Sequence, residues 1–598
     1  MSDEKRNWKK FQNISFDGKK FSKRVRKAET VTVRHARKFL VGRLENIRSV
    51  RRHVISWLLL VGMMIVIVGL QLMWFQRSYQ TTAPVSGGTY AEASLGPIDT
   101  LNPLYASSDA EVAASRLLFS SLYSYDSTGH LQGDLAEGTQ VDATGTLYTV
   151  TLRSNAMWHD GAHVTAQDVA FTVNLIKNAA SRSPLRSNWQ DVLVKVVNNM
   201  TVQFQLPAVY AAFPHALTFA VLPEHLLGTL DPGSIRESSF SRSPIGSGPF
   251  SFNLLQTVNT SHTYSIVHMT AFANYYKGAP LLNRFEVHAY TDQAAIASAL
   301  RAGQVNAAAD LTGANVAQID THNYTVISRP ISSGVYALFN LNTPILQDHT
   351  VRKALQLATD APAIRKSLHV GVVSLDLPFV NGQLTGPDVP HAPASNATQA
   401  AALLDQAGWT LVKGQRQKDG TPLALSVVTT KNSLYEKSLE TLAGQWRNLG
   451  IVVNIRVVDT ADPASNFVRN TLQARDYDVL LYELSIGGDP DVYAYWHSSQ
   501  IGIDGYNFSN YSNKSADAAL ASARSRLEPN LRNAKYEAFA RQWLEDAPAV
   551  GLYQPVAPYV VNKNMQSLSP TATLVSPLDR YANVLYWSVG NHSVYKTP

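Results

Sequence analysis

The pattern of hydrophobic and polar positions is dominated by one long apolar run near the amino terminus, at residues 54–75. This run has 22 residues and no charged side chain. At about 1.5 Å rise per residue, a helix of that length measures roughly 33 Å, which suffices to cross the core of a bilayer. Trp57, Trp74 and Phe75 near its ends are typical of the aromatic belts at membrane interfaces. The pattern therefore predicts one transmembrane helix.

After that run, strand and helix patterns alternate to the end of the chain. Residues 147–152 alternate apolar and polar side chains as a half-buried strand does. Thr165 and Asp168 have the spacing of a capping box ahead of an apolar helix that reaches Ile176. Apolar residues recur at helical spacing in three further segments, 292–303, 351–358 and 396–407.

The clearest unit lies at residues 434–482. A helical stripe of leucines with Trp446 ends at Gly450, and a β-branched strand follows at 451–458. After a second helical stretch, residues 477–482 have the pattern of a short buried strand. This strand–helix–strand order predicts an α/β fold, and the part of the chain after the apolar run is long enough for two or three domains of about 150 residues.

Charge is divided unevenly along the chain. Residues 1–53 contain 17 Lys and Arg against 5 Asp and Glu, whereas the rest contains 35 against 40. The basic flank predicts a cytoplasmic tail, so the long remainder of the chain would lie outside the cell. A secretory signal peptide is the alternative, but its apolar core has only about 7–15 residues and precedes a small-residue cleavage site. No clear site of that kind follows Phe75, so we expect an uncleaved anchor.

The chain has no cysteine, which excludes disulfides, thiolate metal sites, a cysteine nucleophile and a lipid-modified cysteine as a second anchor. It also lacks the phosphate-binding loop, the zinc-protease motif, the nucleophile elbow and any nucleic-acid recognition motif. His159 and His163 have a spacing that can chelate a metal on a helix, but Asp160 and Gly161 between them indicate a surface turn. We expect no enzymatic activity, no cofactor, no bound metal and no nucleic-acid partner.

Local motifs that follow one another between about residues 90 and 560 resemble the family 5 extracellular solute-binding proteins, the large peptide- and nickel-binding receptors of ABC importers. Each motif is weak alone, but their common order is specific. The motifs are LAE at 135–137 with LYTVTLR at 147–153, WHDG at 158–161 and TAQDV at 165–169; PIGSGPF at 244–250; NYYKGAP at 274–280; YALFNLN at 336–342 with VRKAL at 351–355; DYDVLLY at 476–482 with DP at 489–490; and DAPAVGLY at 546–553.

The resemblance implies an α/β, two-lobed periplasmic-binding-protein-like fold of type II, with an inserted subdomain in lobe I and the ligand in the cleft between the lobes. It divides the chain into a basic cytoplasmic tail (1–53), the transmembrane helix (54–75), a linker (76–89), lobe I (90–330, with the inserted subdomain at about 118–200), lobe II (331–548) and a return to lobe I (549–598).

In peptide-binding relatives, an Asp just after the cleft strand pairs with the amino group of the ligand. Here that position falls on Ile486 or Gly487, whose side chains cannot bind an ammonium group, although Glu483 and Asp489 lie close by in sequence. Asp489 also suits a turn before Pro490, and the nearby aromatic residues also suit core packing. The ligand-binding candidates are Asp109, Tyr482, Glu483, Gly487, Asp489, Tyr493, Trp496 and Tyr553.

The resemblance implies a membrane-anchored receptor that captures extracellular oligopeptides and delivers them to an ABC permease whose ATPase subunits are separate chains. Its amino terminus would be cytoplasmic, its receptor part extracellular, and the free receptor monomeric. A nickel chelate or another small solute remains an alternative ligand because the ammonium-binding Asp is missing. A transmembrane sensor is a further alternative, but 53 residues leave little room for a signalling domain. No catalytic constellation supports an extracellular hydrolase.

Overall fold

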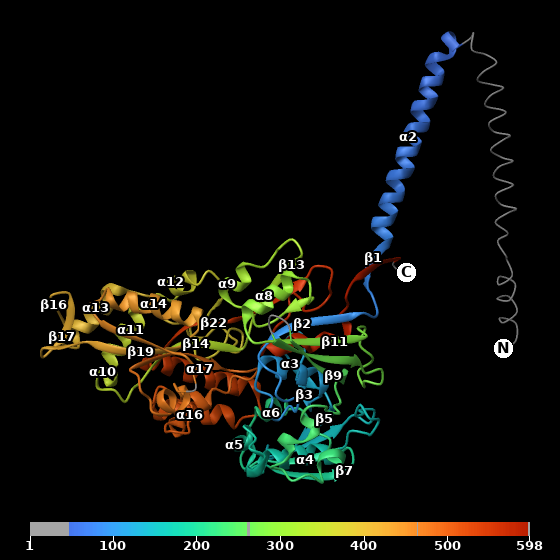
Figure 1. Cartoon of the computed structure of the whole chain (residues 1–598). Helices are drawn as coiled ribbons and strands as arrows, with labels where there is room; N and C mark the ends of the chain where they lie inside the picture. Colours follow the sequence, from blue (N-terminus) through green and yellow to red (C-terminus); the bar gives the residue numbers. More distant parts are fainter. Residues whose placement is uncertain (1–46, 260–262, 463, 596–598) are drawn as a thin grey trace. The chain divides into compact units, whose positions relative to one another are not determined.

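The computed structural model describes residues 47–259, 263–462 and 464–595. The apolar run forms α2 (Ile47–Tyr79), whose segment Arg51–Phe75 is long and apolar enough, by length and composition, to cross a membrane (Figure 1). Most of the basic tail lies outside the described residues. Within the stretch expected to be a linker, the chain completes α2 and forms β1 (Gln80–Pro84), which pairs with β24 (Asn591–Tyr595).

The first lobe is built on a seven-stranded mixed sheet in the order β13-β23-β12-β2-β11-β10-β9. In the central strand β2 (Thr89–Leu95), Tyr90 faces one apolar core, while Ala91 and Ala93 face another, so both faces of the sheet are covered. The other strands are β9 (Phe250–Asn259), β10 (Thr263–Ala271), β11 (Arg284–Tyr290), β12 (Ala307–Ala308), β13 (Tyr324–Pro330) and β23 (Val556–Asn562), with helices α3 (Asp109–Leu118), α8 (Gln293–Arg301) and α9 (Gly313–Ala317).

A four-stranded antiparallel sheet, in the order β5-β6-β8-β7, lies within the sequence of this lobe. The strand prediction at 147–152 is confirmed by β6 (Leu147–Leu152). The capping box is also confirmed, because the Asp168 carboxylate accepts hydrogen bonds from the Thr165 backbone N–H at 2.8 Å and hydroxyl at 3.1 Å. The remaining elements are β3 (Tyr123–Tyr125), β4 (Leu131–Gly133), β5 (Ala136–Val141), β7 (Leu193–Asn198), β8 (Thr201–Gln205), α4 (Ala166–Lys177), α5 (Arg186–Trp189), α6 (Phe213–Ala216) and α7 (Glu224–Leu227).

The glycine-rich turn before β9 packs closely against the backbone at the end of α3. A Cβ atom on Gly246 would lie 1.9 Å from the Leu118 carbonyl oxygen, and one on Gly248 would lie 2.4 Å from that of Leu117. His159 spans the turn: its Nε2–H donates to the Gly248 carbonyl at 3.0 Å, and its Nδ1 accepts from the Gly246 N–H at 3.2 Å. Both ring nitrogens are therefore used to hold the turn, which leaves neither of them for a metal.

We expect His159 to make the stability of this fold depend on pH. Burial lowers its pKa to about 4, although the Gly248 carbonyl and Asp160 oppose this. Between pH 6.5 and 4 the unfolded chain therefore takes up a proton that the folded chain does not, so stability falls as the pH falls, by about 3 kcal/mol in all. Unfolding in urea at several pH values should show this slope reduced in His159→Gln. His163→Gln, at an exposed position, is the control and should leave it unchanged.

The second lobe contains a six-stranded sheet in the order β15-β22-β14-β21-β19-β20, with helices on both faces (Figure 1). The predicted unit at 434–482 is confirmed as α14 (Ser433–Arg447), β20 (Val452–Val458), a short π-helix at Val468–Gln473 and β21 (Val479–Ser485). The helices predicted at 351–358 and 396–407 are confirmed as α11 (His349–Ala358) and α13 (Ala397–Gln406).

Further elements complete this lobe. They are β14 (Ser333–Phe339), β15 (Val373–Ser374), β19 (Ala424–Thr430), β22 (Ala549–Gln554), the small sheet of β16 (Thr410–Val412), β17 (Gln415–Lys418) and β18 (Thr421–Pro422), and helices α10 (Pro344–Gln347), α12 (Ala361–Ser367), α15 (Tyr493–Trp496), α16 (Lys514–Arg524) and α17 (Pro529–Asp546).

The chain passes from the seven-stranded to the six-stranded sheet between β13 and β14, and returns between β22 and β23. The two crossings lie side by side, since the Ile331 N–H donates to the Pro555 carbonyl at 3.2 Å and the Gln554 amide donates to the Ile331 carbonyl at 2.9 Å. After the return, residues 577–586 form a 3₁₀ segment, η9 (Pro577–Tyr586). This topology is the predicted two-lobed α/β fold; the residue boundaries given above for tail, linker, lobes and insertion stay a prediction.

Candidate functional site

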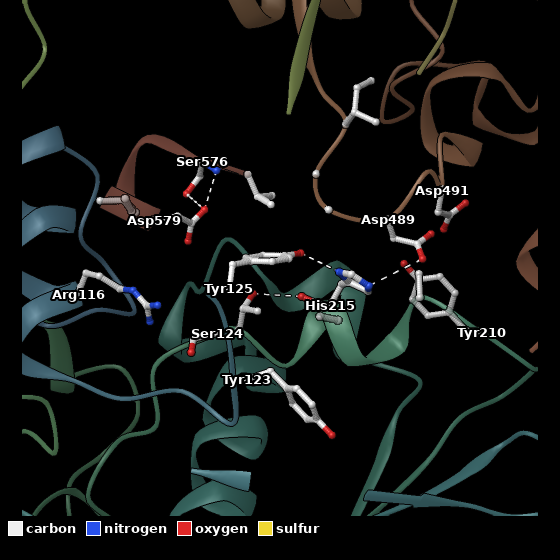
Figure 2. Close-up of a pocket in the computed structure, with 18 residues that line it drawn as sticks. Arg116, Tyr123, Ser124, Tyr125, Tyr210, His215, Asp489, Asp491, Ser576 and Asp579 are labelled. Carbon is white, nitrogen blue, oxygen red and sulfur yellow. Dashed lines mark hydrogen bonds and ion pairs between the residues drawn. The ribbon is translucent and has the colours of Figure 1, made fainter. Parts of the chain in front are cut away.

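A cavity of about 440 Å³, here called the main cleft cavity, lies where the two lobes meet (Figure 2). Its walls come from the end of α3, β3, the segment around α6, the loop after β21 and the start of η9. The polar residues that line it are Arg116, Tyr123, Ser124, Tyr125, Tyr210, His215, Thr218, Asp489, Asp491, Ser576 and Asp579.

Two glycines shape the loop after β21. The N–H groups of Ile486 and Gly487 both donate to the carbonyl of Ser332, each at 2.9 Å, which pins the loop to a crossing segment. Gly487 has φ +82°, a left-handed conformation that favours glycine. At Gly488, a Cβ atom would lie 2.5 Å from Cε1 of Tyr125 in the first lobe. The position of the ammonium-binding Asp of relatives is therefore a glycine-rich contact between the lobes.

The acids that follow these glycines are already paired. Asp489 binds Arg532 of α17 through both oxygens, at 2.8 and 2.6 Å, and Asp491 binds Arg524 of α16 at 2.9 and 2.7 Å. Burial alone would lower the pKa of Arg532, but its hydrogen bonds to Asp489 and the charge of that carboxylate raise it above its usual range. Charge-assisted paired bonds of this kind are strong. Asp489 lines the cavity but is not a free acceptor for a ligand cation.

His215 connects the two lobes across this cavity (Figure 2). The Tyr125 hydroxyl donates to its Nδ1 at 2.7 Å, and its Nε2 lies 3.8 Å from Oδ2 of Asp489. Burial lowers the pKa of His215, and Asp489 opposes that effect only in part. A neutral ring therefore links an aromatic residue of the first lobe to the Asp489–Arg532 pair of the second.

Asp579 and Arg116 were not predicted from the sequence. Ser576 and Asp579 form a capping box at the start of η9, with Oδ2 of Asp579 accepting from the Ser576 N–H at 2.7 Å and hydroxyl at 3.0 Å. The S-x-x-D spacing is visible in the sequence, but a cap at a surface helix has the same spacing. Arg116 lies in the last turn of α3, ahead of a strand that the pattern did not indicate.

A second cavity of about 200 Å³, here called the tyrosine cavity, lies further along the junction of the lobes. Glu483 of β21 accepts from the Tyr435 hydroxyl at 2.5 Å, while Asp310 of the first lobe accepts from the Ser94 hydroxyl at 2.5 Å and the Leu95 N–H at 3.1 Å. Its other walls include Leu434, Tyr553, Pro555, Pro558, Tyr559 and Arg580. The cavity is thus mostly aromatic and apolar, with one carboxylate from each lobe.

The predicted ligand-binding residues fall into two groups. The first group lines the cavities: Gly487 and Asp489 in the main cleft cavity, Glu483 and Tyr553 in the tyrosine cavity. Asp109 begins α3, where desolvation and the charge of Asp310 raise its pKa to about 6. Asp109 is not among the residues that line either cavity, and a role of these five residues as ligand contacts stays a prediction.

The remaining candidates pack against other side chains of the second lobe. The Tyr482 ring contacts Phe467 and Phe508, with centroids 5.9 and 5.8 Å away, and Tyr493 stacks on His497 at 4.0 Å. Trp496 is fully buried and meets Trp543 at 5.4 Å. None of these three is among the residues that line the two cavities within the described chain. Aromatic spacing alone could not separate core from cleft, because both environments are apolar.

Two α/β lobes joined by paired crossings around an interlobe cavity define a binding protein that encloses its ligand between lobes. Residues 130–504 match the family described as bacterial extracellular solute-binding proteins, family 5. The chain belongs to this family. Its members are solute-binding proteins rather than enzymes, so the chain is an extracellular solute-binding protein of the ABC importer type, with an apolar helix near its amino terminus.

Relatives with known ligands are similar over nearly their whole length. The oligopeptide-binding protein AppA of Bacillus subtilis is 26% identical over 498 residues, which cover 81% of this chain and 89% of AppA. Its structure in complex with a nonapeptide has a TM-score of 0.67 and covers 84% of this chain and 99% of AppA. The structure of NikZ from Campylobacter jejuni in complex with Ni(L-His) is 26% identical, with a TM-score of 0.69 and coverage of 84% and 99%.

Proposed function

We propose that this protein is a membrane-anchored receptor that captures extracellular oligopeptides between its lobes and delivers them to an ABC permease. The observation that carries the peptide assignment is the pair of cavities along one junction, since a chain with several side chains needs successive binding pockets. The similarity to AppA, whose structure holds a nonapeptide, supports it.

The second candidate ligand is a nickel chelate, favoured by the equal similarity to NikZ with Ni(L-His). Where the chelator leaves coordination positions of the metal open, protein side chains fill them, most often a histidine imidazole. His215 lines the main cleft cavity, but Tyr125 occupies its Nδ1 and its Nε2 faces Asp489. Because neither ring nitrogen of His215 is open to a metal, this arrangement favours a peptide over a nickel chelate as the ligand.

The anchor assignment is supported by the length of α2 and by the basic residues before it. A tether keeps the receptor close to a permease in the same membrane and so raises its effective concentration there. Transport itself needs a ligand that binds the closed conformation of the receptor more tightly than the open one. A ligand with equal affinity for both conformations would leave their populations unchanged.

Thermal unfolding of the full chain, extracted from membranes in detergent, tests this function. An intact mass of 65.5 kDa would show that α2 is retained. We expect random-sequence tetrapeptide and nonapeptide pools to stabilise the protein, by about 2.7 kcal/mol where a binder is at a hundredfold excess over its Kd. Ni(L-His) is the parallel probe. Stabilisation by Ni(L-His) alone would contradict peptide binding, and a shorter chain would contradict the anchor.

A further inference from the structure

Two charged side chains of the main cleft cavity differ from their neighbours because they have no ion-pair partner within 4 Å in the described part of the chain. Asp489 and Asp491 each form an ion pair with an arginine. Asp579 and Arg116 line the same cavity without such a pair. A charge buried without a partner is costly, so we expect another group to supply the counter-charge. In a binding protein the missing partner is a group on the ligand.

Asp579 has one carboxylate oxygen to offer. Its side chain is only 5% exposed, and the hydrogen bonds from Ser576 go to Oδ2. The Val575 N–H is a further backbone donor to this carboxylate, but Oδ1 has no side-chain partner among the described residues. Figure 2 shows the carboxylate in the cavity wall near Arg116 and Tyr125. Burial raises the pKa of Asp579 even though the charge of Arg116 opposes it. An added cation would therefore be favourable at this carboxylate.

Arg116 is partly buried at the end of α3 and makes one long hydrogen bond, 3.4 Å to the Ser121 hydroxyl. Most of its five N–H donors are thus available to an acceptor in the cavity. Its charge acts on Asp579 and Asp134 without a direct hydrogen bond to either. The cavity therefore presents one carboxylate and one guanidinium group, neither of which has an ion-pair partner within 4 Å in the described part of the chain.

We propose that Asp579 binds the free α-ammonium group of the ligand peptide, and that Arg116 binds the carbonyl oxygen of the same first residue. This inference rests on the proposed function and names the group recognised at that site. In the first residue of a peptide, the positively charged α-ammonium group lies only three bonds from a carbonyl oxygen that accepts hydrogen bonds, so one residue can satisfy both side chains. The acceptor would thus come from the first lobe, through η9, in place of an acid after β21, where Ile486 or Gly487 stands.

The test compares random-sequence nonapeptide pools with free or acetylated amino termini, by titration calorimetry on the full chain in detergent. For the unaltered protein we expect the acetylated pool to bind about tenfold to a hundredfold more weakly, because a charge-assisted hydrogen bond is lost. Asp579→Asn should remove this preference while its amide oxygen keeps the cap. Asp360→Asn is the matched control, since Asp360 caps α12 by accepting from the Ala363 N–H at 2.9 Å and lines neither cavity.

The outcomes separate this inference from the proposed function. Equal binding of both pools, or a preference that persists in Asp579→Asn, would overturn the role of Asp579 and leave the peptide receptor standing. Failure of both pools to bind the unaltered protein would overturn the peptide receptor and this inference with it. Equal binding of the two pools by the unaltered protein overturns the role of Asp579 even where Asp579→Asn does not fold.

Discussion

Replacement of Glu92 by alanine is expected to lower the free energy of unfolding by about 3–5 kcal/mol, the largest effect of any single substitution considered. Glu92 is fully buried at the centre of β2, and Arg580 donates to it from Nε at 3.2 Å and Nη2 at 2.8 Å. The hydroxyl groups of Tyr559 and Tyr581 donate to the same carboxylate. Without it, a buried guanidinium group and two buried hydroxyl groups lose their acceptor.

Urea unfolding of the full chain measures this loss. Glu440→Ala is the matched control, because Glu440 pairs with Arg447 at 3.4 Å on the surface, where ion pairs contribute little. The double substitution Glu92→Met with Arg580→Met should recover much of the stability, since it removes both charges together. A loss in Glu92→Ala no larger than that in Glu440→Ala would contradict the importance of this pair.

Replacement of Gly488 by valine is expected to weaken peptide binding about tenfold to a hundredfold. The new Cβ would lie 2.5 Å from the Tyr125 ring across the cleft, so the lobes could close only if that ring moved. Overpacking of this kind costs about 1–3 kcal/mol, and here the cost falls on the closed state that holds the ligand. Calorimetry with the free nonapeptide pool gives the change in Kd.

A second substitution distinguishes a steric clash in the closed state from a general loss of folding. Tyr125→Ala makes room for the valine, so the double variant should bind more tightly than Gly488→Val alone. Gly371→Val is the control, because no atom lies within 4 Å of a Cβ at that position. If Gly488→Val bound as the unaltered protein does, the contact between Gly488 and Tyr125 would have no part in closure.

Local sequence patterns predicted several helices and strands with nearly correct bounds. β6, α8, α11, α13, α14 and β20 begin and end within about two residues of the predicted positions. Capping residues explain this success, since Asp292 and Asn396 accept hydrogen bonds from backbone N–H groups three residues later in the chain. The pattern did not indicate the last residues of α2 after Phe75 or the short strand β1.

The candidate site was predicted only in part. The loop of Gly487 and Asp489 was found through the resemblance to the family, which places an acid just after the strand at 477–482, and both residues line the main cleft cavity. The partners of Asp489 could not be found, because Arg532 lies 43 residues further along the chain. Asp579 was missed for the same reason, since the return of the chain to the first lobe brings it to the cavity.

The sequence by itself determined the membrane-helix candidate, the alternation of helices and strands and the family, because each depends on local periodicity or on motifs in order. The tertiary structure alone decided which charges are free. Asp489, Asp491 and Asp579 are the same residue type in the same cavity, yet two are neutralised by arginines of α16 and α17 and the third is not. Such a difference depends on through-space distances between segments far apart in the chain, which no local pattern encodes.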